Sequence, residues 1–316
     1  MKSYKIFSEL TEKQIEADVA NFFGWISPIE SRLPYILLDV NEQITGADKK
    51  YDSVIPIYMQ FKVSEGLTQL NHSLINRIPT NRITPIIPPL QAIRIFRKEN
   101  ELYDRPTLYF KLREKAKNAL DFQHNVLLRL SCLGKAYAFY VAPLTLFRKE
   151  YEEMLFAKSE RFLLDPFYYE RIEKIHQLKW VSYFGRVPFL RAHVSIIPHE
   201  NVDSANHFYS FSTTGTEIAW HSGKIMTRSA SRLVEILWYI FSRAFNSIES
   251  WNNCAQYLRS LKGLSKEIGL SNQNSFSNEE LPVRSLLNFG NELYQAYNIR
   301  QWLLLASSDS LLEQIK

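Results

Sequence analysis

The sequence predicts a mixed α/β (α+β) protein, on three observations. Residues 10–145 alternate between helical and strand-like patterns, in the order helix, three strands, helix, strand. Residues 146–316 are mostly helical in pattern and contain one predicted β-hairpin. A chain of 316 residues is long enough for one well-buried core and a second module. We therefore expect two regions, residues 1–145 and an accessory or regulatory region, residues 146–316.

The first predicted element is an amphipathic helix from Thr11 to about Trp25. Thr11 and Gln14 have the spacing of a capping box, which favours a helix start. Apolar side chains then recur at helical intervals and predict one buried face. The next segment, residues 35–40, is apolar and follows a proline, which is typical of a strand.

The remaining elements of this region follow from local pattern. Residues 42–48 and 54–63 are expected to form a hairpin, so that the three strands make a meander. Residues 107–112 predict a further strand. Residues 113–133 are expected to form one long helix that Gly134 ends, and an aromatic strand, residues 135–141, completes the unit.

Two polar segments end the second and third strands of this meander. Gly46-Ala47-Asp48 precedes Gln60-Phe61-Lys62, and Asp48 and Gln60 are twelve positions apart. Alternate residues of a strand share a face, so Gln60 and Lys62 point together while Phe61 points into the core. A carboxylate is the ligand that Mg²⁺ prefers, and an ammonium stabilises charge on phosphate oxygens. The arrangement predicts a metal-dependent phosphodiester site.

The Gln-x-Lys triplet alone is a weak signal. A second copy, Gln177-Leu178-Lys179, follows a helical pattern and has no Gly-x-Asp before it. Asp52 competes with Asp48, although its shorter gap leaves less room for two paired strands. The alternative interpretations are a strand with a solvated lysine and an aspartate that forms a turn after Gly46.

With its flanking elements, this pattern resembles the PD-(D/E)XK nuclease superfamily, in particular the Mrr-like branch in which glutamine replaces the glutamate of Glu-x-Lys. The resemblance covers residues 10–145 and implies a restriction-endonuclease-like αβββαβ core and a metal-dependent endonuclease that cuts DNA. It implies Asp48, Gln60, Lys62 and Glu16 as catalytic residues, with Mg²⁺ (or Mn²⁺) on Asp48, Glu16 and Gln60. Glu12 is the reserve for Glu16. Gln123, beside His124, matches a glutamine that faces the site from the crossover helix.

An insert, residues 65–106, carries further candidates for substrate binding. It is rich in proline and holds Arg77 and Arg82, whose guanidinium groups suit phosphate contacts. The alternative is an ordinary surface loop followed by a strand at residues 92–96.

Composition sets the remaining expectations. The formal net charge of +5 is compatible with DNA as a partner. The two cysteines, Cys132 and Cys254, form no CxxC motif, which argues against a zinc site or a disulfide framework. The N-terminus lacks the apolar core of a signal peptide, and the apolar helix at residues 233–245 is too short to span a bilayer. We expect a cytoplasmic protein without a membrane partner.

The second region gives fewer signals. Residues 191–197 predict a strand, and residues 207–212 and 217–221 a hairpin on which His207 and His221 would lie close enough for a metal pair to be considered. Three functions remain open. The first, which we favour, is a DNA endonuclease of the anti-phage defence or restriction type. The second is an inactive nuclease-fold binding module. The third is an effector subunit activated only by a partner, with residues 146–316 contacting a partner protein or a second copy.

Overall fold

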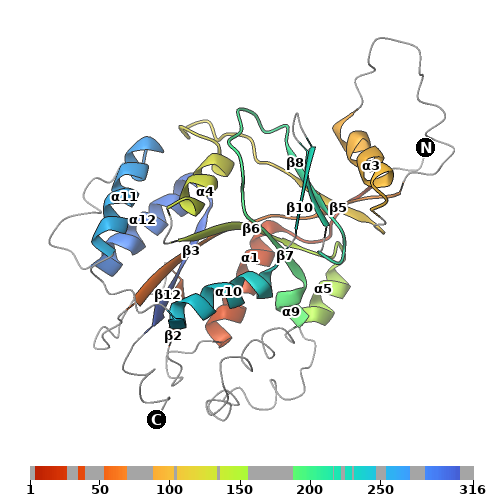
Figure 1. Cartoon of the computed structure of the whole chain (residues 1–316). Coiled ribbons are helices and arrows are strands. Elements are labelled where there is room, and N and C mark those ends of the chain that lie inside the picture. The colour runs from red at the N-terminus through yellow and green to blue at the C-terminus, as the bar shows by residue number, and fades with distance from the viewer. Residues whose placement is uncertain are drawn as a thin grey trace.

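The computed structural model describes residues 4–26, 35–39, 53–69, 88–102, 105–133, 136–155, 188–215, 217–221, 225–229, 231–246, 254–270 and 282–306. Within these ranges the chain forms two six-stranded sheets and eight helices. The predicted mixed α/β class is therefore confirmed (Figure 1).

The first sheet has the strand order β11-β7-β6-β3-β12-β2. Its strands are β2 (Tyr35–Asp39), β3 (Ser53–Phe61), β6 (Tyr137–Pro143), β7 (His193–Ile196), β11 (Ser231–Arg232) and β12 (Arg300–Ala306). β3 and β6 are parallel, and the other neighbours are antiparallel. A parallel pair needs a crossover connection, and helix α4 lies within the connection between β3 and β6.

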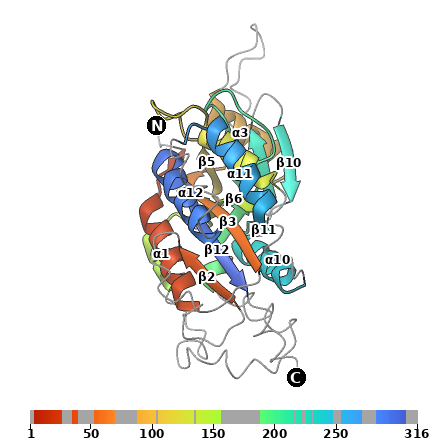
Figure 2. The same ribbon diagram turned by 90° about the vertical axis from the view of Figure 1, so that its left-hand side faces the viewer.

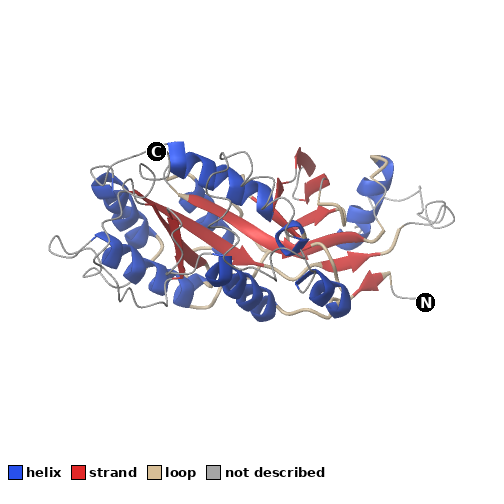
Figure 3. Ribbon diagram, turned by 90° about the horizontal axis from the view of Figure 1, so that it is seen from below, coloured by secondary structure: helices blue, strands red, loops and turns tan. Residues whose placement is uncertain are grey.

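The second sheet has the order β1-β4-β5-β8-β9-β10, with all neighbours antiparallel. Its strands are β1 (Lys5–Ile6), β4 (Glu65–Leu67), β5 (Thr107–Lys111), β8 (Phe208–Phe211), β9 (Glu217–His221) and β10 (Ile225–Ser229). The predicted hairpin is β8 and β9. Seen from below, strands run along most of the long axis of the molecule, with helices on both sides (Figure 3).

Helices cover both faces of the first sheet (Figure 1). The helices are α1 (Glu12–Ile26), α3 (Pro89–Glu99), α4 (Gln123–Ser131), α5 (Arg148–Leu155), α9 (Pro188–Arg191), α10 (Leu233–Asn246), α11 (Cys254–Glu267) and α12 (Pro282–Tyr297). Ile57, Met59 and Phe61 of β3 pack with α1, α5, α9 and α10. Tyr58 points to the opposite core, which α4, α11, α12 and one face of the second sheet complete. This alternation is the one predicted for β3.

Strand β12 takes a place that the sequence pattern assigns to another segment. It pairs with β2 from Trp302 to Ala306 and with β3 from Arg300 to Ala306, so it lies between them (Figure 2). The predicted meander is therefore wrong, because β12 occupies the position expected for residues 42–48, which lie outside the described residues. β12 itself lies in a region whose pattern is expected to be helical, because periodicity does not distinguish a short, apolar, buried strand from a helix.

Strands from both sides of residue 145 share both sheets. β6 pairs with β7 across this boundary in the first sheet, and β5 pairs with β8 in the second. Residues 146–316 thus complete the sheets that the first region begins. The expected regulatory role of these residues stays a prediction.

Two local predictions are wrong. The expected helix over residues 113–133 begins only at Gln123, because residues 113–118 are exposed and have no apolar face to bury. Residues 92–96 belong to helix α3 rather than to a strand. α3 packs Ile93 against Tyr109 and Phe208 of the second sheet, which gives a helical rather than a strand-like burial pattern.

The helix expected at residues 233–245 is α10. In the part of the chain that the structure describes, no helix combines the length and apolar character needed to cross a membrane.

Candidate functional site

The end of β3 brings Gln60 and Lys62 into the interior. Gln60 has 0% and Lys62 3% of its surface exposed. The Gln60 amide nitrogen donates a hydrogen bond to the carbonyl of Phe61 at 2.9 Å. The backbone N–H of Lys62 donates to the carbonyl of Val141 at 2.9 Å, which fixes the end of β3 against β6.

Gln123, the first residue of α4, connects these two side chains. The Lys62 ammonium Nζ donates to Gln123 Oε1 at 3.3 Å. Gln123 Nε2 donates to Gln60 Oε1 at 2.5 Å and also to the backbone carbonyl of Tyr297, at the end of α12. The predicted approach of Gln123 to the Gln-x-Lys strand is thus present, and a residue of the C-terminal region completes the contact.

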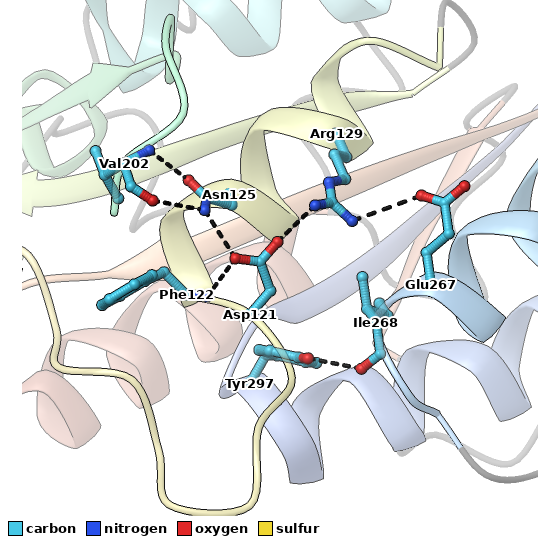
Figure 4. Close-up of polar contacts among 8 residues, drawn as sticks. All are labelled: Asp121, Phe122, Asn125, Arg129, Val202, Glu267, Ile268 and Tyr297. Atoms are coloured by element: carbon cyan, nitrogen blue, oxygen red, sulfur yellow. Dashed lines mark hydrogen bonds and ion pairs between the residues drawn. The ribbon is translucent and has the colours of Figure 1, made fainter. Parts of the chain in front are cut away.

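A polar network holds the start of α4 in this place (Figure 4). Asp121 Oδ1 accepts hydrogen bonds from the Phe122 N–H and from the Asn125 side chain, both at 2.7 Å. Arg129 pairs with Asp121 at 2.6 Å and with Glu267 of α11 at 3.5 Å. No side chain caps α4 itself, so this network holds the chain just before the helix and fixes the position of Gln123.

The first helix supplies two carboxylates, and they have different partners. Glu12 Oε1 lies 3.7 Å from Lys62 Nζ, and its side chain is 38% exposed. Glu16 Oε1 lies 3.0 Å from Arg300 Nη1, and both side chains are mostly buried. Glu12, the reserve candidate, is therefore the carboxylate that contacts Lys62, whereas Glu16 joins α1 to β12.

Burial dominates the protonation of Lys62. Removal from water disfavours the ammonium and lowers the pKa of Lys62 below its ordinary value. The negative charge of Glu12 acts in the opposite direction and raises this pKa, while the positive charge of nearby Arg113 lowers it. The site thus holds a desolvated cation whose charge depends on one partly exposed carboxylate.

His124, next to Gln123, faces away from this site. Its Nε2 contacts the carbonyl of Glu200 at 3.0 Å and its Nδ1 contacts the Tyr140 hydroxyl at 2.9 Å. Its ring stacks on Trp220, with ring centroids 5.4 Å apart. Burial lowers the pKa of His124 to about 4, so the imidazole is neutral near pH 7.

Several predicted residues cannot be placed. Asp48, its competitor Asp52, and both Arg77 and Arg82 lie outside the described residues. Within the described ranges, no group of three or more His, Cys, Asp or Glu side chains could hold a metal ion. A metal on Gln60 and a glutamate of α1 would therefore need a ligand such as Asp48.

The histidine pair considered on the β8–β9 hairpin does not form. Phe208 pairs directly with His221 and Tyr209 with Trp220, so His207, which precedes Phe208, and His221 point to opposite faces. His221 accordingly contacts Ser210 at 2.7 Å, whereas the ring of His207 stacks on Trp220.

Three contributors to the site carried no signal in the local sequence. They are Arg113, the carbonyl of Tyr297 and Arg300, and the last two depend on β12 lying beside β3. Sequence pattern places Arg113 in a helix that begins only at Gln123, and it predicts no strand at Arg300, so it does not bring these residues to the site. A comparison of this chain with family models, curated proteins and solved structures finds no match.

Proposed function

We propose that the chain is a metal-dependent DNA endonuclease, with Lys62 as its catalytic ammonium. The observation that carries this proposal is the convergence of Lys62 from β3, Glu12 from α1 and Gln123 from α4. The scaffold supports it, because β3 and β6 are parallel and α4 lies in their connection. A restriction-type or anti-phage role stays a prediction.

The described residues fit a divalent metal in part. Hard ions such as Mg²⁺ take oxygen ligands, usually with one or two carboxylates, and this cluster offers the amide oxygen of Gln60, while Glu12 pairs with Lys62. Asp48 would supply a carboxylate. A metal held there would activate a water and neutralise charge on the phosphate.

The side chains of the chain itself have separate roles in this proposal. Lys62 stabilises the negative charge that develops on the phosphate, and its low exposure strengthens the interaction. Gln123 orients the ammonium through its amide oxygen. Glu12 keeps Lys62 protonated, because its charge raises the pKa of Lys62.

One observation favours a second candidate, an effector whose site opens only after a partner or signal acts. Gln60, Lys62 and Gln123 are each at most 5% exposed, and Gln123 Nε2 is bound by the carbonyl of Tyr297. A DNA phosphate would have to displace these contacts. Under this alternative the isolated chain does not cleave DNA, and a partner that moves α12 and β12 activates cleavage.

The test is incubation of the purified chain with supercoiled plasmid and with linear DNA, in Mg²⁺, Mn²⁺ or EDTA. We expect cleavage with either metal, no cleavage in EDTA, and loss of cleavage in Asp48→Ala and Lys62→Ala. Lys179→Ala is the matched control, because it alters the second Gln-x-Lys triplet and should leave cleavage unchanged.

Three other outcomes separate the alternatives. Cleavage that persists in both Asp48→Ala and Lys62→Ala removes this site from the mechanism. Cleavage that appears only when a cell extract or a purified partner is added selects the partner-activated effector. Metal-independent DNA binding without cleavage under any condition selects the binding module.

A further inference from the structure

A short exposed loop with a high positive charge leads into α4. Residues 113–118 have the sequence Arg-Glu-Lys-Ala-Lys-Asn, and all six are exposed. Lys111, just before them, pairs with Glu114 at 2.9 Å. Within the described part of the chain, Arg113, Lys115 and Lys117 make no ion pair. We call residues 113–118 the basic loop.

Both ends of the basic loop are fixed. Leu112 is 3% exposed, and its N–H donates to the carbonyl of His207 at 3.0 Å. At the other end, Asp121 accepts a hydrogen bond from the N–H of Phe122, just before α4, and pairs with Arg129 at 2.6 Å (Figure 4). The basic loop is thus an exposed segment whose two ends are held by these contacts, not the continuation of a helix.

The basic loop lies beside the Lys62 site. It ends five residues before Gln123, which binds Lys62 directly. Its first residue, Arg113, is near enough for its charge to lower the pKa of Lys62. Arg113 therefore lies near the buried ammonium, and Lys115 and Lys117 follow it in the same exposed loop.

This arrangement opposes folding stability and suits a polyanion. Like charges gathered on a few residues repel one another, and no carboxylate in the loop other than Glu114 offsets them. The phosphates of duplex DNA would neutralise them, and lysine and arginine side chains are the usual backbone contacts in protein–DNA complexes.

We propose that the basic loop contacts the phosphate backbone of duplex DNA and guides it to the Lys62 site, a proposal that rests on the nuclease function above. The contacts carry no sequence information, because phosphates are the same at every base pair. The loop therefore contributes affinity and orientation, and it leaves sequence specificity to other parts of the chain.

The test measures binding without cleavage. A fluorescently labelled duplex is titrated with protein in EDTA over a series of salt concentrations, for wild type and for Lys115→Ala/Lys117→Ala. Each lost phosphate contact should reduce the slope of log K against log salt by about 0.9. We expect the double variant to lower the slope by about twice that amount and to bind several-fold more weakly at fixed salt.

The matched control is Lys262→Ala/Lys266→Ala on α11, which removes the same charge from exposed positions. It should keep the wild-type slope, and thermal melting should show both double variants folded. Equal slopes in the two double variants would overturn the proposal, as would wild-type protein that binds RNA but no DNA duplex.

The salt titration and the cleavage assay described above together separate this proposal from the nuclease function. If the slope of log K against log salt depends on the basic loop but the chain does not cleave DNA with any metal, the nuclease function is contradicted. The DNA-binding role of the basic loop then remains supported. Metal-dependent cleavage together with an unchanged slope would leave the nuclease in place and remove the loop from substrate binding.

Discussion

Gln123 and His124 are neighbours on α4 and are almost equally buried, yet they belong to two different clusters. Gln123 belongs to the lysine cluster, which also contains Glu12, Gln60 and Lys62. His124 belongs to the tryptophan cluster, in which the ring of Trp220 stacks on His124 and on His207. Tyr140, Tyr209 and His199 complete it.

The two clusters differ in the charge of the polar groups that they bury. In the tryptophan cluster, burial lowers the pKa of His124 to about 4, so this imidazole is neutral at pH 7, and Trp220 donates to Glu200. In the lysine cluster a cation is buried beside neutral amides, and its only described carboxylate partner is partly exposed. Burying a charge with incomplete pairing costs stability. Such conflicts between folding and residue choice are expected at functional sites, so the lysine cluster is the better candidate.

The largest expected effect comes from Lys62→Met, which keeps the length of the side chain and removes the charge. Metal-dependent cleavage should fall by at least about a hundredfold, because an electrostatic stabiliser of the transition state contributes at least this much. Stability should stay equal or rise, since the desolvated cation is gone. Cleavage assays and urea unfolding measure the two quantities. Full cleavage in Lys62→Met, or loss of cleavage in Lys179→Met, would reverse the ranking of the two triplets.

Trp220→Ala is the counterpart in the tryptophan cluster. Trp220 is 1% exposed and packs against Tyr209 with ring centroids 4.4 Å apart. Its truncation should lower the free energy of unfolding by about 3–5 kcal/mol, while cleavage per folded molecule stays unchanged. Phe7→Ala is the control, because Phe7 is 66% exposed and should change stability little. If Trp220→Ala abolishes cleavage without loss of stability, the assignment of catalysis to the lysine cluster and of stability to the tryptophan cluster is wrong.

How far the sequence predicts each cluster depends on how local its contacts are. The capped start of α1 follows from Thr11, whose Oγ1 accepts from the Gln14 N–H at 3.2 Å. The inward direction of Gln60 and Lys62 follows from strand alternation. The choice between Glu12 and Glu16 does not, because Arg300, which pairs with Glu16, comes from β12 far along the chain. Nearness to a buried stripe favours Glu16, but it does not reveal its partner.

Acidification should weaken the part of the molecule that contains the buried histidines. His124 and His193 have pKa values lowered by burial to about 4, against about 6.5 in the unfolded chain. The unfolded state therefore binds more protons between pH 6.5 and 4, so stability is complete above pH 6.5 and is lost as the pH falls toward 4. Each histidine should contribute on the order of 3 kcal/mol to this loss.

Urea unfolding at pH 7 and pH 4.5 measures the effect. His124→Phe and His193→Phe should each reduce the difference in unfolding free energy between the two pH values. The exposed control is Lys149→Ala, whose side chain is 88% exposed. A wild-type protein equally stable at both pH values would contradict the assignment of neutral, buried imidazoles.

Gln60→Glu tests whether the amide occupies a metal position. A carboxylate attracts a hard divalent ion more than an amide does, so Mg²⁺ and Mn²⁺ affinity should rise several-fold by calorimetry. The change also places a charge beside Lys62 and should raise the pKa of Lys62. Unchanged affinity in Gln60→Glu, together with no effect of Asp48→Ala, would leave no metal site at the end of β3.

The smallest expected effect separates the two glutamates of α1. Lys62 must be protonated to stabilise phosphate charge, so cleavage should fall as the pH rises through the pKa of Lys62. Glu12 raises this pKa, so Glu12→Gln should move the alkaline limb of the pH profile to lower pH. The shift should be less than about one unit, because Glu12 is 38% exposed and solvent screens the pair.

Glu16→Gln should leave the limb in place, since Glu16 pairs with Arg300. Profiles of kcat/KM against pH measure both variants, and NMR titration of the Lys62 ammonium gives the same comparison if the chain cleaves nothing. A shift in Glu16→Gln without one in Glu12→Gln would make Glu16 the partner of Lys62 in solution.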